Sequence, residues 1–333
     1  MNNNVTTMTR WPAEWEKHAA TWMAFPCRRE IWTDGLESAQ NAYAKVANLI
    51  SEYEPLNMLI RAEHTQVARK KLSSSIRLIE LGLDDSWARD TAPIWVFQSD
   101  QLKGLDFQFN AWGNKFFPFD NDAKIAQQVC SLANTHCEKI DLVLEGGSIH
   151  SNGKGTLMTT KECLLNSNRN PGLTQREIES VLASSLGVKS FIWLENGIVG
   201  DFDTDGHIDN IACFADEQTV LTQRCEKVSE NYSIYQANKS IVNESGFELV
   251  EISEPQASYS DGNRLPLSYI NFYLANGAVI LPQFGCQQDG EALSVMTDLF
   301  PERKIHPVDA NPILVGGGGI HCITMQQPLL ENK

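Results

Sequence analysis

Basic side chains are scarce relative to acidic ones. The chain has 27 Lys and Arg against 42 Asp and Glu, a formal net charge of −15. A protein that binds nucleic acid needs a basic surface to contact phosphate groups, so this balance argues against a nucleic-acid partner. An acidic chain can attract a cationic substrate over long range, although the same charge could serve solubility alone.

Long apolar segments are missing too. No stretch approaches the ~20 apolar residues of a membrane-spanning helix, and the first twenty residues lack the apolar core of a signal peptide. The eight cysteines form no CxxC pair and no regular Cys/His metal spacing. We therefore expect a cytoplasmic protein without a membrane partner, in which most cysteines are small buried apolar side chains.

What is present is an alternation of strand and helix patterns without a linker between them. The 333 residues would suffice for two domains, but we find no boundary and predict one α/β domain over 1–333. Strand–strand–helix–strand units of similar length could recur along it. Apolar runs predict strands, Asn-Gly turns predict hairpins, and helical spacing and capping predict helices. The predicted strands are 55–60, 76–81, 93–97, 102–109, 191–194, 211–215 and 247–252, the hairpins 148–160 and 269–282, and the helices 35–53, 174–187, 226–246 and 288–300.

Cys322 follows four glycines, residues 316–319, near the C-terminus. The segment IHCIT around it alternates as a strand does, which would turn His321 and Cys322 to opposite faces. His321 is then a poor candidate for activating its neighbour. The glycines would allow unusual backbone angles and close approach of a ligand. A Gly-rich loop beside a merely buried cysteine would read the same way.

His207 and Asp209 stand two residues apart, just before the apolar run IACF. On a strand both side chains would project to the same side, and the carboxylate would raise the pKa of the imidazole. The pair could instead be structural. A zinc site is a further alternative, since both residue types bind zinc, but no HExxH motif or second paired histidine supports it.

Two further carboxylates lie in telling contexts. Asp90 precedes a turn with proline and a strand, and Trp87 comes three residues earlier. Glu145 ends an apolar run and meets two glycines, which would let another group approach it. Alternatively, Arg89 and Asp90 pair with each other, and the glycines after Glu145 form an ordinary turn.

Taken together, these side chains suit a planar cation. A guanidinium is a permanently charged fork that carboxylates bind bidentately. Its central carbon is a poor electrophile, so a strong nucleophile such as a thiolate must attack it. Ammonia then needs a proton to leave, which a histidine can supply as general acid.

At the level of motifs the chain resembles the agmatine deiminases of the guanidine-modifying (pentein) superfamily. The similar segments follow the expected order over nearly the whole chain, and together they resemble agmatine deiminases more than arginine deiminases or peptidyl-arginine enzymes. Ala92 and Gly319 depart from the usual Gly and Asn of that family. The segments are TWMAFP (21–26), SWARDTAPIWV (86–96), FNAWGNKF (109–116), LEGGSIHSNGKGTLMTTKECLLNSNRNP (144–171), DGHIDNIACF (205–214) and GGGGIHCITMQQP (316–328).

The resemblance implies a five-bladed α/β-propeller built of ββαβ units with pseudo-five-fold symmetry, one catalytic domain, and a homo-oligomer. It implies hydrolysis of agmatine to N-carbamoylputrescine and ammonia through a covalent thiouronium, with no metal or organic cofactor. Cys322 would be the nucleophile and His207 the general acid and later base. Asp90 and Asp209 would clamp the guanidinium, Glu145 would support His207 or the guanidinium, and Trp87 would line the substrate channel.

Other functions stay open on the sequence. Within the same chemistry, the substrate could be free or peptidyl arginine, or the amidino group could pass to another amine. In another class, the chain could be a non-catalytic propeller that binds polyamines or a protein partner. A metallohydrolase using His207 and Asp209 is a third alternative. A free arginine would require a basic partner for its carboxylate, and we cannot assign one from the sequence.

Overall fold

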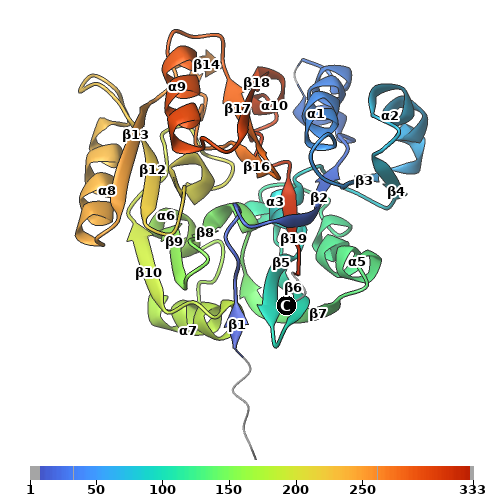
Figure 1. The fold of residues 1–333 in the computed structure, drawn as a ribbon, viewed down its shortest axis with the longest axis horizontal. Helices are drawn as coiled ribbons and strands as arrows, with labels where there is room; N and C mark the ends of the chain where they lie inside the picture. Colours follow the sequence, from blue (N-terminus) through green and yellow to red (C-terminus); the bar gives the residue numbers. More distant parts are fainter. Residues whose placement is uncertain (1–7, 33, 261, 331–333) are drawn as a thin grey trace, which may run out of the picture.

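Five small mixed sheets, with helices around them, make up the fold (Figure 1). The structure is a computed structural model that describes residues 8–32, 34–260 and 262–330. The domain predicted over 1–333 therefore extends beyond the described residues at both ends.

Four of the sheets share one connectivity. Two strands pair antiparallel through a tight turn, and the third pairs parallel with the second after a helix, as a parallel crossover requires. This confirms the recurring strand–strand–helix–strand unit. The units are β5 (Ile94–Gln98), β6 (Gln101–Gln108), α5 (Ile125–Leu132), β7 (His136–Val143); β8 (Ile149–Ser151), β9 (Thr156–Thr160), α7 (Gln175–Leu186), β10 (Ser190–Leu194); β11 (Ala212–Phe214), β12 (Thr219–Arg224), α8 (Tyr232–Glu244), β13 (Glu248–Ser253); and β16 (Tyr273–Ala275), β17 (Ala278–Gln283), α9 (Asp289–Leu299), β18 (Lys304–Asp309).

The fifth sheet joins the two ends of the chain. Its first strand comes from the C-terminal segment and pairs antiparallel with a strand from the N-terminal segment, Met325 opposite Trp22. In Figure 1 this is the meeting of the red and dark blue strands. The next two strands pair parallel through helices. The elements are β19 (Met325–Pro328), β2 (His18–Ala24), α1 (Leu36–Ile50), β3 (Leu56–Ile60), α2 (Thr65–Lys71) and β4 (Arg77–Glu80).

Short elements connect these units. A two-residue strand extends the β5–β6–β7 sheet at its β5 edge, and a two-stranded ribbon stands apart. The short helices lie between longer elements, several of them around the middle of the molecule. The short strands are β1 (Thr9–Arg10), β14 (Tyr259–Ser260) and β15 (Asn263–Arg264). The short α-helices are α3 (Ala88–Thr91), α4 (Ala111–Asn114), α6 (Lys161–Leu164) and α10 (Asn311–Leu314). The 3-10 helices are η1 (Arg29–Ile31), η2 (Ala62–His64), η3 (Asp122–Lys124), η4 (Gly146–Ser148) and η5 (Ile208–Asn210).

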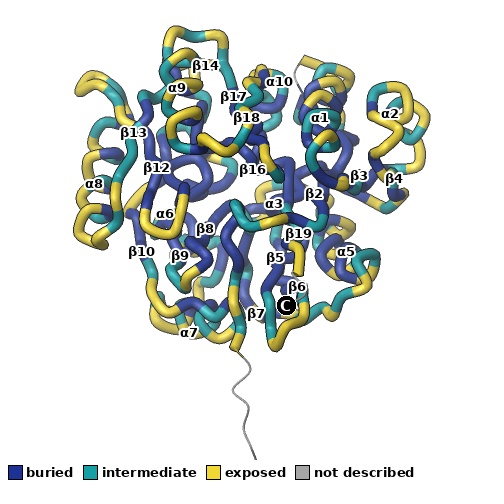
Figure 2. The backbone as a smooth tube through the Cα atoms, in the orientation of Figure 1, coloured by how far each residue is buried: buried dark blue, intermediate teal, exposed yellow. Residues whose placement is uncertain are grey.

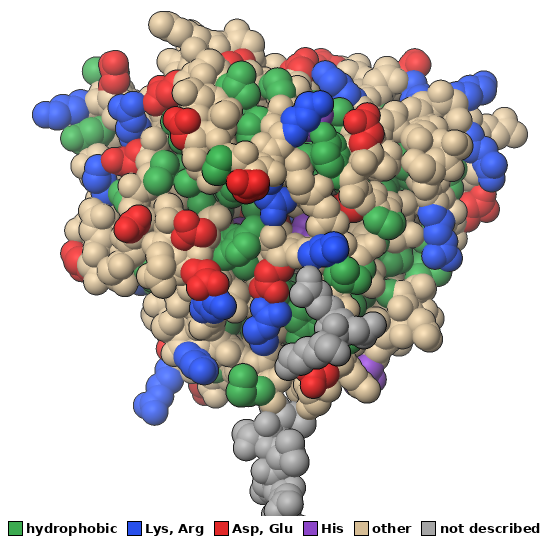
Figure 3. Space-filling view, in the orientation of Figure 1, with side chains coloured by type: hydrophobic (Ala, Val, Ile, Leu, Met, Phe, Trp, Pro, Cys, Tyr) green, Lys and Arg blue, Asp and Glu red, His purple; other side chains and the backbone are tan. Residues whose placement is uncertain are grey.

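The sheets take successive places around the middle of the molecule, with the long helices toward the outside (Figure 1). Figure 2 shows buried backbone in the middle and exposed backbone on the outer helices. Helix α7 illustrates the packing, because Ile178, Leu182 and Leu186 recur every four residues and are buried. Each such side chain contributes about 1.5–3 kcal/mol on burial. Figure 3 shows acidic and basic side chains interspersed on one face rather than separated by sign.

Most of the local predictions are confirmed. The Asn276-Gly277 hairpin joins β16 to β17, and the capping box of Thr174 and Glu177 starts α7. The strand expected over IHCIT is wrong, because residues 320–323 form turns and β19 begins only at Met325. Thr324 stabilises these turns, since its hydroxyl donates to the carbonyls of Ile320 and His321. No helix in the described part of the chain is long and apolar enough to cross a membrane.

Candidate active site

Two cavities meet at the segments that carry the predicted site residues. The front cavity is lined by Trp87, Asp90 and Cys322, together with Asp85, Trp112 and Asp203. The rear cavity is lined by Glu14, Arg89, Gly146, His150 and His321. Arg89–Asp90 and His321–Cys322 each contribute one residue to each cavity. The two segments are joined directly, because the Arg89 backbone N–H donates to the Cys322 carbonyl at 3.1 Å.

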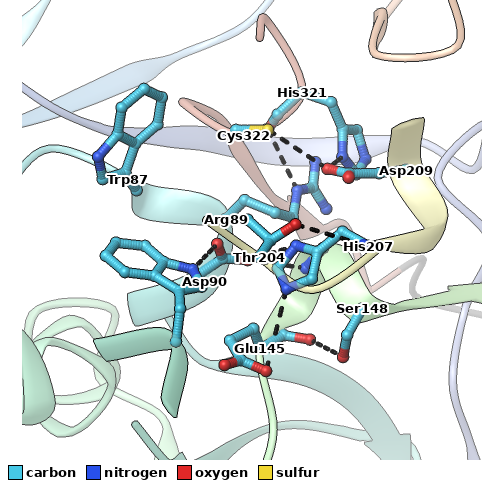
Figure 4. Close-up of polar contacts among 12 residues, drawn as sticks. Trp87, Arg89, Asp90, Glu145, Ser148, Thr204, His207, Asp209, His321 and Cys322 are labelled. Carbon is cyan, nitrogen blue, oxygen red and sulfur yellow. Dashed lines mark hydrogen bonds and ion pairs between the residues drawn. The ribbon is translucent and has the colours of Figure 1, made fainter. Parts of the chain in front are cut away.

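Cys322 lies in the turn before β19 with its thiol in the front cavity (Figure 4). Its Sγ lies 3.5 Å from Asp209 Oδ2 and accepts a hydrogen bond from Asn271 Nδ2 at 3.2 Å. Burial, and then the charges of Asp209 and Asp90, raise the pKa of this thiol well above its usual value. A cation placed among these groups would reverse the electrostatic part of that shift.

Asp90 lies in helix α3 at the wall of the front cavity. Its Oδ2 accepts from Trp112 Nε1 at 2.8 Å and its Oδ1 from the Gly147 backbone N–H at 2.9 Å. Burial raises the pKa of Asp90, as do the neighbouring Asp209 and Glu145. The alternative pairing of Arg89 with Asp90 is wrong, because Arg89 turns away to Glu14 and Gln326.

Trp112 reaches Asp90 from an unusual stretch of backbone. Ala111, Trp112 and Asn114 have φ of 53°, 53° and 61°, and Gly113 has φ of 88°. Consecutive non-glycine residues in the left-handed region cost about 1–2 kcal/mol each. The surrounding contacts hold this turn, including the Asn110 side chain that accepts from Gly113 N. Trp112 belongs to the FNAWGNKF motif, but the motif alone did not mark it as a site residue.

His207 precedes η5 with both ring nitrogens buried inside the site. Its Nδ1 lies 4.0 Å from Asp90 Oδ1, and its Nε2 lies 3.9 Å from Glu145 Oε2. Our expectation that His207 and Asp209 share a strand is wrong, because His207 immediately precedes the 3-10 helix η5 and Asp209 lies in it. Asp201 folds this segment by accepting from the His207 backbone N–H and from Asn210.

Glu145 follows β7 and is fully buried between a cation and an imidazole. Its Oε1 accepts from Arg169 Nε at 2.6 Å, while its Oε2 points toward His207. Arg169 also donates to Asp205 and to the Thr204 carbonyl. Sequence reasoning missed Arg169, because a single arginine in an Asn-rich segment gives no signal that it is buried.

Gly147 marks the point where the site residues converge. A methyl group on its Cα would lie 2.6 Å from His207 Nδ1 and 3.0 Å from both Asp209 Oδ2 and Asp90 Oδ1. Any other residue would therefore fill the space between these groups. This explains the second glycine after Glu145 by packing rather than by turn geometry.

The four glycines before Cys322 line the cavity for a related reason. Only Gly317 has a positive φ, of 100°. Methyl groups at Gly316, Gly318 and Gly319 would lie 2.3 to 2.4 Å from atoms of Trp32, Trp87 and Asn271, respectively. The glycines thus let two tryptophans and the amide that contacts the thiol pack directly on the backbone.

Several polar atoms of the site have no hydrogen-bond partner within the described residues. They are both nitrogens of His207, Oε2 of Glu145 and Oδ1 of Asp209. Buried polar atoms are almost always paired, and each unpaired one costs about 1–3 kcal/mol. An imidazole and two carboxylates that converge in this state beside a thiol are suited to bind a flat, hydrogen-bond-donating cation.

A metal is less well matched to these groups. Among the described residues, two clusters have spacing suited to an ion: Glu145 with Cys163 and His207, and a second cluster in the rear cavity. Asp209 belongs to neither, so the His207–Asp209 metal pair has no geometric basis. Burial, and then the Glu145 charge, raise the pKa of Cys163 well above its usual value, which disfavours the thiolate that a metal requires.

Comparisons with known proteins find similarity to deiminases over nearly the whole chain. The profile described as Porphyromonas-type peptidyl-arginine deiminase matches residues 10–328. An agmatine deiminase of Pseudomonas aeruginosa (strain LESB58) is 39% identical over 354 residues, covering 96% of this chain and 95% of the relative. A solved agmatine deiminase of Enterococcus faecalis superposes with a TM-score of 0.93 at 32% identity, covering 97% of each chain. A substrate-bound cysteine-to-serine variant of a C. jejuni agmatine deiminase gives 0.92 at 31%, covering 96% of each.

Proposed function

This chain belongs to the Porphyromonas-type peptidyl-arginine deiminase family, and we propose that it hydrolyses agmatine to N-carbamoylputrescine and ammonia. The observation that carries the proposal is the set of buried polar atoms without partners on His207, Glu145 and Asp209, of which Asp209 contacts the Cys322 thiol. An imidazole and carboxylates of this kind match the guanidinium group in shape and charge. The agmatine deiminases with which this chain aligns over nearly its full length support the same assignment.

The lining of the front cavity favours agmatine over arginine. Asp85 and Asp203 line it beside the thiol, and no Lys or Arg is among its described lining residues. Burial raises the pKa of Asp203, and it raises the pKa of Asp85 to about 7. Both carboxyl groups would therefore become more acidic beside a bound ammonium. The carboxylate of free arginine would meet these acidic groups, whereas Arg28, 3.9 Å from Asp85, and Lys115, near Asp203, are not among the lining residues.

In the proposed first step, Asp90 and Asp209 hold the guanidinium with its central carbon facing Cys322. Its positive charge offsets the carboxylates that raise the pKa of the thiol, so the thiol ionises as substrate binds. His207 takes the thiol proton, sulfur bonds to carbon, and the tetrahedral adduct forms. His207 then protonates one nitrogen, which leaves as ammonia while a neighbouring nitrogen restores the double bond.

In the proposed second step, water attacks the S-alkylthiouronium carbon and His207 takes a proton from it. The new tetrahedral adduct collapses to the carbonyl and expels the thiol, which keeps the former hydroxyl proton. The proton left on His207 passes to solvent and balances the one that ammonia takes up there. Glu145, held by Arg169 at 2.6 Å, directs its second oxygen toward the imidazole in both steps.

We also propose that the five sheets are the blades of a five-bladed α/β-propeller forming a single catalytic domain in the cytoplasm. The repeated connectivity of the sheets supports the propeller. The pairing of β19 with β2 supports one domain, because it joins the two ends of the chain. The free cysteines of the described residues are consistent with a reducing compartment.

The test is ammonia release from agmatine, free arginine and a blocked arginine peptide under one set of conditions. We expect kcat/KM for agmatine to exceed the other two at least about 100-fold, because an unpaired buried charge is costly. Comparable turnover of arginine would reject the assignment. Mass spectrometry of protein quenched during turnover should find the amidine adduct on Cys322.

Measurements of agmatine binding and of activity after chelation separate the other functional classes. A protein that binds agmatine tightly but never releases ammonia would be a polyamine-binding propeller. Loss of activity after exhaustive chelation, restored by a divalent metal, would indicate a metallohydrolase.

A further inference from the structure

Behind the thiol, His321 connects the two cavities through its two ring nitrogens. Its Nδ1 lies 2.9 Å from Asp209 Oδ2, and its Nε2 lies 2.8 Å from Glu14 Oε2. All three side chains are buried. Both hydrogen bonds end on carboxylate oxygens, and an ionised carboxylate only accepts. Both nitrogens must therefore donate, which makes His321 an imidazolium between two carboxylates. Figure 4 shows the Asp209 side of this arrangement.

The charged and titratable groups that face His321 come from several elements. Arg89 in α3 lies 3.5 Å from Glu14, the ring of His150 in β8 lies 6.4 Å from the ring of His321, and Cys322 follows in the chain. Burial alone would lower the pKa of His321, and Arg89 acts in the same direction. The carboxylates of Glu14 and Asp209 outweigh both, so the pKa is raised.

His150 is the neutral member of this group. Its Nδ1 accepts from the Phe214 backbone N–H at 3.2 Å, so a neutral ring carries its proton on Nε2. Burial lowers its pKa to about 4. Glu14, His150 and His321 are close enough for a metal ion, but His321 uses both nitrogens on carboxylates and His150 keeps a proton on its free one. The cluster is therefore a poor metal site.

Asp209 is the residue whose position and charge depend most on His321. Its Oδ2 receives His321 and the Cys322 thiol, while its Oδ1 has no partner within the described residues. Burial would raise the pKa of Asp209, but the hydrogen bond and charge of His321 bring it below its usual value. His321 thus holds Oδ2 of Asp209, and Oδ1 is left to accept a hydrogen bond from a ligand.

We propose that Glu14 and His321 are positioning residues for the deimination, holding Asp209 ionised and turned so that Oδ1 receives the substrate guanidinium. The inference rests on the proposed function and adds two residues that do not touch the substrate. Glu14 keeps the proton on His321, and His321 keeps Asp209 in place. Two residues of the rear cavity then determine the charge of a carboxylate that contacts the Cys322 thiol.

Because His321 must be protonated to hold Asp209, substrate binding should weaken at alkaline pH. Since the folded pKa of His321 is raised, its proton and its hold on Asp209 are complete below the ordinary histidine pKa and are lost as pH rises through the raised value. Replacing Glu14 by Gln removes the larger carboxylate contribution, so the pKa of His321 falls. The alkaline limb of kcat/KM for agmatine should then move to lower pH, by about one unit.

The experiment compares wild type with E14Q, His321→Asn and the matched control His150→Asn. His321→Asn should raise KM for agmatine about 10- to 100-fold, as removal of an orienting partner does elsewhere, with a smaller effect on kcat. His150→Asn removes a buried imidazole from the same cavity without removing a charge. It should lower thermal stability but leave KM and the alkaline limb unchanged.

Two outcomes would overturn the inference while wild type turns over agmatine. One is an alkaline limb in E14Q that matches wild type, and the other is the same rise in KM for His150→Asn as for His321→Asn. Nitrogen NMR of histidine-labelled wild type gives an independent readout near pH 7, where both His321 nitrogens should report imidazolium, and a neutral ring would reject the proposal. If wild type fails to turn over agmatine, the proposed function fails, and the NMR result still decides the charge of His321.

Discussion

The residues around His207 and those of the rear cavity are of the same kinds, but they differ in how completely their polar atoms are paired. In the rear cavity, Glu14 pairs with His321, and Arg89 donates to the His321 carbonyl, Met325 Sδ and Gln326, while its Nη2 lies 3.5 Å from Glu14 without a hydrogen bond. In the front site, both nitrogens of His207 and one oxygen each of Glu145 and Asp209 have no hydrogen-bond partner in the described structure. Unpaired buried groups are expensive, so the residues around His207 cost folding stability that the more fully paired rear residues do not.

The largest difference should come from removing the proposed nucleophile, Cys322. Cys322→Ser should lower kcat at least about 1,000-fold, because a serine hydroxyl is a far weaker nucleophile here, while calorimetry should still detect agmatine binding. Cys130→Ser is the matched control, since Cys130 is also buried but lies in helix α5. A serine variant that keeps a tenth of wild-type activity would remove Cys322 from the mechanism.

Substitutions at two neighbouring glycines should separate an effect on the geometry of the site from an effect on folding stability. Gly147→Ala places a methyl group 2.6 Å from His207 Nδ1, so kcat/KM should fall about 100-fold, as it does when a catalytic group is displaced. Gly146→Ala places its methyl group 2.2 Å from the Arg89 carbonyl oxygen, which should cost about 1–3 kcal/mol of folding stability. Kinetics and thermal melts of both variants check this, and equal profiles would contradict the division between the cavities.

A smaller effect concerns the ionisation of the thiol. Because the pKa of Cys322 is raised, its alkylation by iodoacetamide should still be rising above pH 9 in the free protein, about tenfold per pH unit below the pKa. Asp90→Asn removes one of the charges that raise the pKa, so alkylation at pH 8 should be about tenfold faster. Asp298→Asn, exposed on α9, should change nothing. A wild-type plateau near pH 8 would show that the thiol is not shifted.

The smallest effect should come from outside both cavities. Thr174→Ala removes the side chain that caps α7, which should lower the Tm by about 2 °C. Since α7 lies at the periphery (Figure 1), KM and kcat for agmatine should stay at wild-type values. A change in KM would mean that the outer helices influence the site.

Local patterns in the sequence predicted much of the fold. Both Asn-Gly hairpins and the capping box depend on residues within a few positions, and all three are present as expected. The errors lie where distant contacts override local preference. IHCIT alternates as a strand does, yet Asn271 accepts from the His321 backbone N–H, and Thr324 closes the turn. His207 and Asp209 likewise leave the strand because Asp201 folds their segment.

Sequence reasoning also named the residues proposed to react but not all of those that hold them. Asn271 contacts the thiol and Arg169 contacts Glu145, and neither lies in a pattern that suggests a function. His321 was discounted because a strand would have turned it away from Cys322. In the structure it shares Asp209 with the thiol.

The residue types in their motifs by themselves favoured chemistry on a guanidinium, because a thiol, an imidazole and several carboxylates together suit that group. Tertiary structure decided which groups stay unpaired and which are neutralised. Asp209 and His321 are 112 residues apart in the chain, and their hydrogen bond exists only because the fold brings the segments around β11 and β19 together. Pairing between distant charges depends on packing, which no local pattern encodes.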